Sequence, residues 1–475
     1  MLKKKGKESP LSGLKIKKSM VKKETTDNRI NVVVLGAAGR DYHNFNVFFR
    51  NNRRYNVVAF TQAPGQTLSE LGRLGKRIYP SELSGKNYPN GIPIFLEKDL
   101  PEIIKKYNVH EVVLAYSDLS HNEVGHKAAI ALANGADFRL MGPETTMLKS
   151  NKFVISICGV RTGVGKSPTS RRVTQILRKA AVRFVVIRHP MPYGDLNKMV
   201  VQRFTNKNDL SVYGSTIEER EEYEPHLEEG NIVYAGVDYE KILRQAEKEA
   251  EVMVWDGGNN DLPFIKPNLH IVVADARRPG HELLYYPGEA NLRMADVVLV
   301  NKVDTANPYD AETVIRNAIN VNPRATIIRS AMPMFVDKSE LIKGKRVLVV
   351  EDGPTLTHGG LPFGAATIAA QNAGAYLINP RNNAVGTIKR VFDEYPHLGA
   401  VLPAMGYSKK QIEELEQTIN TTDCDSVLLG TPVDLRTLLN INKPIARVRY
   451  EVQEVMRPNL EDIIFKTLRD NRIIK

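Results

Sequence analysis

Residues 153–167 have the sequence Phe-Val-Ile-Ser-Ile-Cys-Gly-Val-Arg-Thr-Gly-Val-Gly-Lys-Ser, and this stretch decides the fold class. It passes from an apolar run to a glycine-rich turn, and then to a lysine and a serine that open a helix-like segment. Small residues let successive backbone N–H groups converge on phosphate oxygens, and the start of a helix adds the positive end of its dipole. The order of strand, glycine loop and helix therefore predicts an α/β domain with a phosphate-binding loop (P-loop).

The positions of this loop have predicted roles in holding a nucleoside triphosphate. The expected nucleotide-binding residues are Thr162, Gly163, Val164, Gly165, Lys166 and Ser167. The Lys166 ammonium would reach the β- and γ-phosphates and act in catalysis, while the Ser167 hydroxyl would bind Mg²⁺. The loop itself suits ATP and GTP equally as the co-substrate.

One position departs from the pattern G-x-x-x-x-G-K-[ST], because Val160 stands where the first glycine belongs and Gly159 lies one residue earlier. In this respect the loop resembles the ParA- and MinD-like branch of P-loop proteins, in which a second basic residue follows that position. Arg161 stands there in this chain. The resemblance implies that Arg161 acts in catalysis by approaching the transferring phosphate, in its own subunit or across a homodimer.

The composition indicates a folded, multidomain protein. A chain of 475 residues has the length of about three domains. Apolar residues make up 42% and charged residues 25%, the balance of globular proteins. The two cysteines, Cys158 and Cys424, exclude a disulfide framework. No apolar stretch is long enough to cross a bilayer and no secretory signal is present, so we expect a cytoplasmic protein with no membrane partner.

The net charge of +12 is concentrated at the N-terminus. Residues 1–29 contain ten lysines or arginines and three acids, which leaves +5 for the other 446 residues. Because this segment follows no apolar period, we expect a disordered Lys-rich tail. It is interpreted as a solubilising extension, with a polyanion-binding arm as the alternative. Nucleic acid is not an expected partner, since no basic patch is interleaved with aromatic residues.

Beyond the tail, short apolar runs alternate with helix-length amphipathic segments, the pattern of parallel βαβ units. The sequence therefore predicts three consecutive Rossmann-like, doubly wound parallel-sheet domains. They are an N-terminal domain at 30–150, a central P-loop NTPase domain at 151–342 and a C-terminal α/β domain at 343–475. Predicted strands cover residues 32–35, 57–60, 111–115, 138–141, 153–158, 183–188, 252–255, 269–274, 296–300, 326–329, 347–350, 375–378, 426–429 and 445–450.

The N-terminal domain carries only part of a dinucleotide-binding pattern. Its turn at 36–39, Gly-Ala-Ala-Gly, is a fragment of G-x-G-x-x-G. Its second strand ends in Phe-Thr at 60–61, where such a site needs an acid. NAD binding is therefore not expected.

Two further motifs support a nucleotide site in the central domain. The apolar run 252–255 ends at Asp256, whose carboxylate is predicted to act in catalysis and to hold Mg²⁺. A turn cap is the alternative, because the Asp-Gly pair that it forms favours turns. A second run, 297–300, leads into N-K-x-D, and Asn301, Lys302 and Asp304 are predicted to bind the base. This motif favours guanine, with a plain surface turn as the alternative.

Arginines and histidines gather where predicted strands end. The predicted substrate-binding residues are Arg188, His189, Tyr193, Arg203, Arg278 and His358. Ligands of doubly wound folds bind at the carboxyl edge of the sheet, and guanidinium forks pair phosphate oxygens two at a time. The pattern favours a small anionic phosphorylated substrate, with loop capping and interdomain ion pairs as the alternative. No pair of histidines or cysteines recurs at the spacing of metal ligands.

Taken together, the motifs at 34–45, 160–167, 188–195, 256–261, 301–304 and 351–360 resemble the cyclic 2,3-diphosphoglycerate synthetase family, whose relatives are often described as GTPases. The resemblance extends over nearly all of residues 30–455 and implies an ATP-dependent ligase. That enzyme closes 2,3-bisphosphoglycerate into a cyclic pyrophosphate and releases ADP and phosphate, and here Lys166, Arg161 and Mg²⁺ would offset the charge of the transferred group. The alternative, favoured by the N-K-x-D motif, is a GTPase switch or assembly factor acting on a protein partner.

Overall fold

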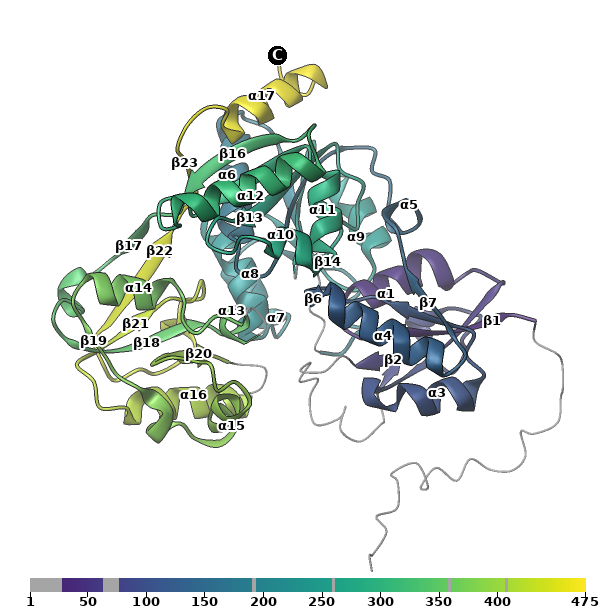
Figure 1. The fold of residues 1–475 in the computed structure, drawn as a ribbon, viewed down its shortest axis with the longest axis horizontal. Helices are drawn as coiled ribbons and strands as arrows, with labels where there is room; N and C mark the ends of the chain where they lie inside the picture. The colour runs from purple at the N-terminus through teal and green to yellow at the C-terminus, as the bar shows by residue number, and fades with distance from the viewer. Residues whose placement is uncertain (1–27, 63–76, 190–193, 259–260, 358–359, 406–408) are drawn as a thin grey trace, which may run out of the picture.

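The computed structural model describes residues 28–62, 77–189, 194–258, 261–357, 360–405 and 409–475. Residues 1–27 of the predicted tail lie outside this set, as do Tyr193 and His358. Within it the chain forms three main sheets, each built largely from parallel strands (Figure 1). The predicted α/β architecture of three parallel-sheet units is therefore confirmed. No helix in the described part of the chain is both long and apolar enough to cross a membrane.

The first sheet contains six strands in the order β3-β4-β2-β1-β5-β7. Its members are β1 (Ile30–Leu35), β2 (Tyr55–Gln62), β3 (Ile78–Tyr79), β4 (Ile92–Leu96), β5 (Glu111–Leu114) and β7 (Asp137–Leu140). In β1, Val32 and Val34 belong to one apolar cluster, while Val33 and Leu35 belong to a second cluster that contains α3 (Leu100–Tyr107). Both faces of the strand are therefore covered, which explains its unbroken apolar sequence.

The turn after β1 is closed by Asp41. Its carboxylate accepts hydrogen bonds from the backbone N–H groups of Ala38, Gly39 and Tyr42, at distances of 2.7–3.1 Å. Burial raises the pKa of Asp41 to about 6, although these donors act in the opposite direction. A dinucleotide would need the amides of this turn for its pyrophosphate. An internal carboxylate thus lies where that anion would bind.

The central sheet has nine strands in the order β10-β11-β9-β12-β8-β13-β15-β16-β23. Its members are β8 (Phe153–Gly159), β9 (Phe184–Arg188), β10 (Gln202–Phe204), β11 (Val233–Ala235), β12 (Val252–Asp256), β13 (Leu269–Asp275), β15 (Val297–Asn301), β16 (Thr326–Ala331) and β23 (Gln453–Glu454). The edge strands β10 and β23 are antiparallel to their neighbours, and the strands between them are parallel. Every residue of β8, β12, β13 and β15 is buried, as expected for strands covered on both faces.

The third sheet has the order β17-β22-β21-β18-β19, and β20 also pairs with β18. Its members are β17 (Met334–Val336), β18 (Arg346–Asp352), β19 (Tyr376–Leu377), β20 (Leu402–Ala404), β21 (Ser426–Leu429) and β22 (Ile445–Tyr450). One face of β18 packs in a cluster with α14 (Ala365–Asn372), and the other packs with α15 (Gly386–Glu394) and α16 (Lys409–Thr421). This sheet is therefore also covered on both faces.

The remaining elements are short or connect the sheets. They are α1 (Arg40–Asn44), α2 (Ser81–Ser84), β6 (Leu119–Ser120), α4 (His121–Ala133), α5 (Pro143–Thr146), α6 (Lys166–Lys179), α7 (Lys207–Val212), α8 (Ile217–Glu228), α9 (Tyr239–Ala246), α10 (His281–Leu284), β14 (Tyr285–Tyr286), α11 (Gly288–Met294), α12 (Pro308–Val321), α13 (Gly353–Leu356) and α17 (Leu460–Asp470). β6 of the N-terminal domain pairs antiparallel with β14 of the central domain. This small ribbon ties the two domains together beside the P-loop.

The chain returns to the central domain after the third sheet. β23 pairs with β16, and α17 lies against the central domain, at the top of Figure 1. Leu460, Ile464 and Leu468 form the apolar stripe of α17 and lie in the core cluster of the central domain. The sequence analysis placed these residues in the C-terminal domain, and it placed β17 in the central one. The local sequence does not show that the chain changes domain at these two places. For α17 the reason is that an amphipathic helix does not specify which apolar surface it covers.

Replacement of Ile464 by Ala measures how strongly α17 supports the central domain. Ile464 is fully buried, so the change should lower the unfolding free energy of that domain by about 2–5 kcal/mol. The only tryptophan of the chain, Trp255, is fully buried in β12, so its fluorescence during urea unfolding reports on this domain. The control is Lys466→Ala on the exposed side of α17, with an expected change within about 0.5 kcal/mol. If the urea midpoint of Ile464→Ala equals that of the wild type, α17 does not stabilise the central domain in the way described.

Candidate active site

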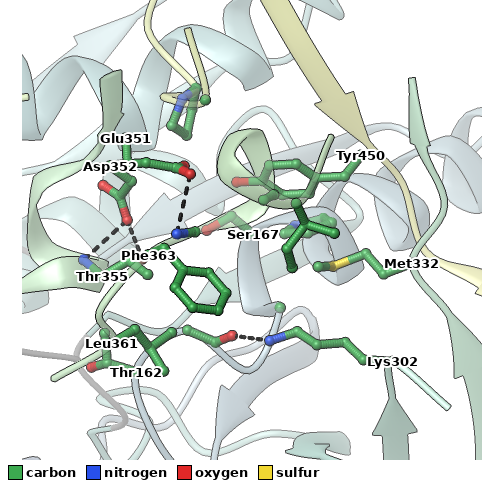
Figure 2. A pocket seen from close by; sticks show the side chains of 18 of the residues that line it. Thr162, Ser167, Lys302, Met332, Glu351, Asp352, Thr355, Leu361, Phe363 and Tyr450 are labelled. Carbon is green, nitrogen blue, oxygen red and sulfur yellow. Dashed lines mark hydrogen bonds between the residues drawn. The ribbon is translucent and has the colours of Figure 1, made fainter. Parts of the chain in front are cut away.

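A cavity of about 360 Å³ opens between the central domain and the third sheet (Figure 2). One wall is the loop between β8 and α6, and the opposite wall is formed by the end of β18 and the segment that follows it. Both walls lie at the carboxyl ends of parallel strands, where doubly wound folds bind their ligands. None of the described residues of the N-terminal domain lines it. This cavity is the candidate active site.

The P-loop has the backbone conformation that phosphate binding needs. Gly163 and Gly165 have φ values of +79° and +107°, which L side chains rarely adopt. A Cβ on Gly165 would overlap Nδ2 of Asn301, so no side chain fits there. The residues of the loop that line the cavity are Thr162, Gly163, Gly165, Lys166 and Ser167. Val164, the remaining predicted residue, is fully buried beneath them.

Lys166 is the first residue of α6, and its side chain is largely buried. Burial lowers the pKa of Lys166, and the neighbouring guanidinium of Arg188 lowers it further. An ammonium in such surroundings binds an incoming anion strongly, since little water screens the pair. The structure therefore places Lys166 where the sequence predicted a phosphate ligand.

The N-K-x-D motif holds the P-loop from behind. The side-chain amide of Asn301 donates to the carbonyl of Val164 at 2.9 Å. The Lys302 ammonium donates to the carbonyl of Gly163 at 2.5 Å, which is the dashed line at Lys302 in Figure 2. Asp304 is exposed, and one of its oxygens accepts from the backbone N–H of Met332 at 3.1 Å. Lys302 lines the cavity, whereas Asn301 is fully buried. Recognition of the base by these residues stays a prediction.

A buried carboxylate, Asp275, gathers three cations beside the loop. Its oxygens lie 2.7 Å from Nζ of Lys302, 3.2 Å from Nε of Arg278 and 3.6 Å from Nε of Arg277. Burial alone would raise the pKa of Asp275, but Lys302, Arg278 and Arg277 outweigh it and bring the value down to about 2. All three cations line the cavity. The sequence analysis named Arg278 but gave Asp275 no role, although an acid at the end of β13 was a visible signal.

Asp256 and Arg188, which the sequence assigned to metal and substrate, bind each other. Nη1 of Arg188 lies 2.8 Å from Oδ1 of Asp256, and Nε2 of His226 lies 3.0 Å from Oδ2. Nη2 of Arg188 forms a further ion pair with Glu222, which lies on the cavity wall. Burial disfavours the Asp256 carboxylate, but Arg188 and His226 overcome this effect and lower its pKa. The pair thus lies beneath the cavity and connects it to the core.

The residues at the mouth of the loop fit a magnesium ion in part. Ser167 Oγ lies 3.5 Å from Oε2 of Glu222, an oxygen that also pairs with Arg188, so a hydroxyl and a carboxylate face the same part of the cavity. In nucleotide sites Mg²⁺ takes one or two such oxygens together with phosphates and water. Asp256 fits only behind them, because Arg188 and His226 occupy both of its oxygens. Among the described residues no group of three or more His, Cys, Asp or Glu could form a metal cage.

Arg161, the second predicted cation, faces the N-terminal domain. Its Nε lies 3.2 Å from Oδ1 of Asp118, and its Nη1 lies 3.2 Å from Nδ1 of His281. Its guanidinium also covers the ring of Tyr285, with 3.7 Å between them. The described lining of the cavity does not include it. Arg161 therefore connects the loop to the neighbouring domain.

The other predicted substrate residues lie away from the cavity lining. Nε2 of His189 is 2.8 Å from Oδ2 of Asp261, in a buried contact that also includes Arg40 of the N-terminal domain. Arg203, on the edge strand β10, pairs with Glu249 through two nitrogens. Of the predicted substrate residues that the structure describes, Arg278 alone lines the cavity.

Carboxylates line the parts of the cavity that face the P-loop. They are Glu221 and Glu222 from α8, and Glu351 and Asp352 from the end of β18. Oε1 of Glu351 accepts from the backbone N–H and the hydroxyl of Thr367, at 2.8 and 2.9 Å. Burial nevertheless raises the pKa of Glu351 to about 7. An acidic wall was not predicted from the sequence, because α8 and β18 meet only in three dimensions.

Comparisons with known proteins identify one close relative. No family model matches the chain. The arginine synthetase ArcE of Thermococcus kodakarensis is 59% identical over 434 residues, which span 91% of this chain and 96% of that protein. Identity of this degree over nearly all of both chains shows a common family.

Similarity to solved structures is weak. Hydrogenase maturation factor HypB from Archaeoglobus fulgidus is 18% identical and covers 38% of this chain and 80% of its own, with a TM-score of 0.25. The UDP-N-acetylmuramate:L-alanyl-γ-D-glutamyl-meso-diaminopimelate ligase from Neisseria meningitides is 10% identical and covers 63% of this chain and 78% of its own, with a TM-score of 0.26. We draw no conclusion from similarities at these TM-scores.

A nucleotide-dependent ligase is the enzyme class that the sequence predicts, and the synthetase relative confirms that class. The substrate implied by the resemblance to cyclic 2,3-diphosphoglycerate synthetase stays a prediction. The chain belongs to the family of the arginine synthetase ArcE.

Proposed function

We propose that the protein is an NTP-dependent synthetase that forms arginine. The proposal rests on the charges around the cavity: Lys166, Lys302 and two arginines lie around the P-loop, and Glu221, Glu351 and Asp352 line another part. One cavity thus offers cations for a triphosphate and anions for a cationic amino acid. The 59% identical relative is named an arginine synthetase, which supports the same product.

Charge distinguishes this product from 2,3-bisphosphoglycerate. Glu221, Glu351 and Asp352 line the cavity together with Tyr450, and the pKa of the Tyr450 phenol is raised by burial and further by these three charges. Two phosphates placed beside them would be repelled by Coulomb forces that little water screens. A guanidinium, in contrast, pairs carboxylates through two parallel hydrogen bonds. The acidic part of the cavity therefore suits arginine better than a bisphosphate.

The chemistry of the product suggests a two-step reaction. The terminal carbon of arginine bears three nitrogens, and a ureido precursor such as citrulline has oxygen in place of one of them. In the first step that oxygen attacks the γ-phosphorus, an O–P bond forms and the bond to the departing NDP breaks. In the second step ammonia attacks the carbon, the C–O bond breaks, and phosphate leaves with the oxygen and one proton.

The residues of the cavity have separate tasks in this reaction. Lys166 and the P-loop amides bind the triphosphate, and the acidic wall orients the amino acid. Mg²⁺ held near Ser167 and Glu222 would offset phosphate charge. Glu351 lies on the side where a guanidinium forms.

Two other functions follow from the sequence motifs. The cations Arg277, Arg278 and Lys302 are the observation in favour of a cyclic 2,3-diphosphoglycerate synthetase, because they could hold further phosphates. A GTPase switch acting on a protein partner is not favoured, since the relative is named as a synthetase.

An assay of substrate dependence tests the proposed reaction. With Mg²⁺, ATP or GTP, citrulline and ammonium, the protein should form arginine, NDP and phosphate in equal amounts, measured by mass spectrometry and phosphate release. Omission of citrulline or of ammonium should stop arginine formation. A cyclic product from 2,3-bisphosphoglycerate, detected by phosphorus NMR, would contradict the proposal. Nucleotide hydrolysis that ignores every added acceptor would contradict it as well.

Replacement of Lys166 by Ala tests the phosphate site. Because the ammonium would stabilise charge on the transferring group, kcat should fall by about 100- to 1000-fold. The control is Lys198→Ala, whose side chain is 84% exposed and outside the cavity lining. Turnover is measured as NDP release at saturating nucleotide, and undiminished turnover in Lys166→Ala would exclude the loop as the active site.

Replacement of Glu351 by Gln tests the acidic wall through pH. Since the pKa of Glu351 is raised to about 7, the carboxylate is mostly protonated at pH 6 and mostly ionised at pH 8. Arginine affinity of the wild type should therefore rise roughly tenfold over this range, as the ionised fraction does. Titration calorimetry should show no such rise in Glu351→Gln, whose amide keeps an acceptor for Thr367.

Stability provides the matching readout for Glu351. Its folded-state pKa lies above the ordinary value of 4.5, so the folded protein holds the proton more tightly than the unfolded chain. The contribution of Glu351 to stability therefore falls as pH rises from about 4.5 to 7. Glu351→Gln should remove this part of the pH dependence in urea unfolding. A variant with the wild-type pH dependence of both binding and stability would contradict the assignment.

A further inference from the structure

The guanidinium of Arg278 has one nitrogen without a partner at the edge of the P-loop. Nε lies 3.2 Å from Oδ2 of Asp275, and Nη2 donates to the carbonyl of Thr162 at 2.8 Å. Nη1 has no hydrogen-bond partner among the described residues, although the side chain is only 10% exposed. Buried donors are almost always satisfied, so an unsatisfied one calls for an explanation. Nη1 itself is enclosed as the structure stands, whereas the guanidinium as a whole lines the cavity, so a small shift of the side chain would bring it to a ligand that supplies the acceptor.

Arg278 lies at the part of the P-loop where the end of a bound triphosphate is expected. A Cβ built on Gly163 would lie 3.7 Å from Nη2 of Arg278, so the guanidinium lies against the glycine turn itself. Asp275 fixes the guanidinium from behind, and the same carboxylate holds Lys302 and Arg277. A guanidinium group that is already held in this way loses little rotational freedom when it binds an anion.

Arg161, which the sequence predicts for contact with the transferred phosphate, is engaged elsewhere. Asp118, His281 and Tyr285 contact its guanidinium, and the first of these belongs to the N-terminal domain. To reach the cavity, Arg161 would have to leave an ion pair and a cation–π contact. Arg278, in contrast, already lines the cavity and keeps its contacts with Asp275 and Thr162 there.

We propose that Arg278, oriented by Asp275, contacts the γ-phosphoryl group of the bound triphosphate during its transfer. The proposal rests on the proposed nucleotide site. In the transfer step the bond between the γ-phosphorus and the β–γ bridging oxygen breaks, and a bond from γ-phosphorus to the acceptor oxygen forms. The guanidinium donates a hydrogen bond to an equatorial oxygen, whose charge it offsets, and no proton is transferred. Arg161 keeps the N-terminal domain on the loop.

The comparison of triphosphate with diphosphate binding tests this contact. Because Arg278 would meet the γ-phosphate alone, Arg278→Ala should weaken binding of a non-hydrolysable triphosphate at least about tenfold more than binding of the diphosphate. Its kcat should fall by about 100-fold or more, with citrulline and ammonium as co-substrates. Arg278→Lys keeps the charge without the fork and should lie between the wild type and Arg278→Ala. Added guanidinium chloride at low millimolar concentration should restore part of the kcat of Arg278→Ala, which a merely structural role would not allow.

Matched variants separate the possible outcomes. Arg293→Ala, half-exposed on α11 and outside the cavity lining, is the control and should keep wild-type kcat and nucleotide preference. If Arg161→Ala loses the triphosphate preference while Arg278→Ala and Arg278→Lys keep it, the contact belongs to Arg161 and the proposal is wrong. Equal weakening of triphosphate and diphosphate by Arg278→Lys, with Trp255 fluorescence unchanged, would also overturn it. A wild-type protein that binds no triphosphate at all would instead refute the proposed function.

Discussion

The P-loop depends on two donors that hold its carbonyl groups. A loop that directs its N–H groups at phosphate must turn its carbonyls towards the protein, where each needs a hydrogen-bond donor. Asn301 and Lys302 provide them for Val164 and Gly163, from positions 137 and 139 residues further along the chain. The close approach of Asn301 is also why Gly165 must be a glycine. In the structure, two residues of the motif predicted to bind guanine, Asn301 and Lys302, thus support the backbone of the P-loop.

The charged side chains around Asn301 and Lys302 form a network of ion pairs. Asp275 holds Lys302 against the loop and orients two arginines at its edge. On the other side, Asp256 fixes Arg188, which in turn pairs with Glu222 beside Ser167. Breaking a buried pair of this kind leaves an uncompensated charge, which costs several kcal/mol. The cavity therefore has a rigid floor, while Glu351 and Asp352 of its acidic wall come from another sheet.

The three domains contribute differently to this arrangement. The central domain supplies the P-loop and its cations, and the third sheet closes the cavity with Glu351 and Asp352. The N-terminal domain approaches the loop from outside, through Asp118 and the ribbon of β6 and β14. Its own glycine turn is occupied by Asp41, so it resembles a dinucleotide domain in fold while its anion site is filled internally. The N-terminal domain thus contacts the loop through Arg161, and none of its described residues lines the cavity.

Much of the backbone could be predicted because its signals are local. The apolar runs of β8, β12, β13 and β15 are unbroken, and the glycines of the P-loop require backbone angles that few other residues adopt. The two-residue strands β6 and β14 were missed because they have no periodicity, and their pairing joins separate domains. Residues 460–470 have the amphipathic pattern of a helix, but that pattern does not specify the surface that α17 covers.

The sequence by itself therefore determined the α/β class, the P-loop and the residues able to carry charge near it. Only the tertiary structure decided how those charges pair: Arg188 with Asp256, Arg161 with the N-terminal domain, and Arg278 with Asp275 at the cavity. The physical reason is that glycine angles and apolar periods act within a few residues, whereas an ion pair depends on which strand ends the crossovers bring together. The number of residues between two charged side chains does not tell how far apart they lie in the folded protein.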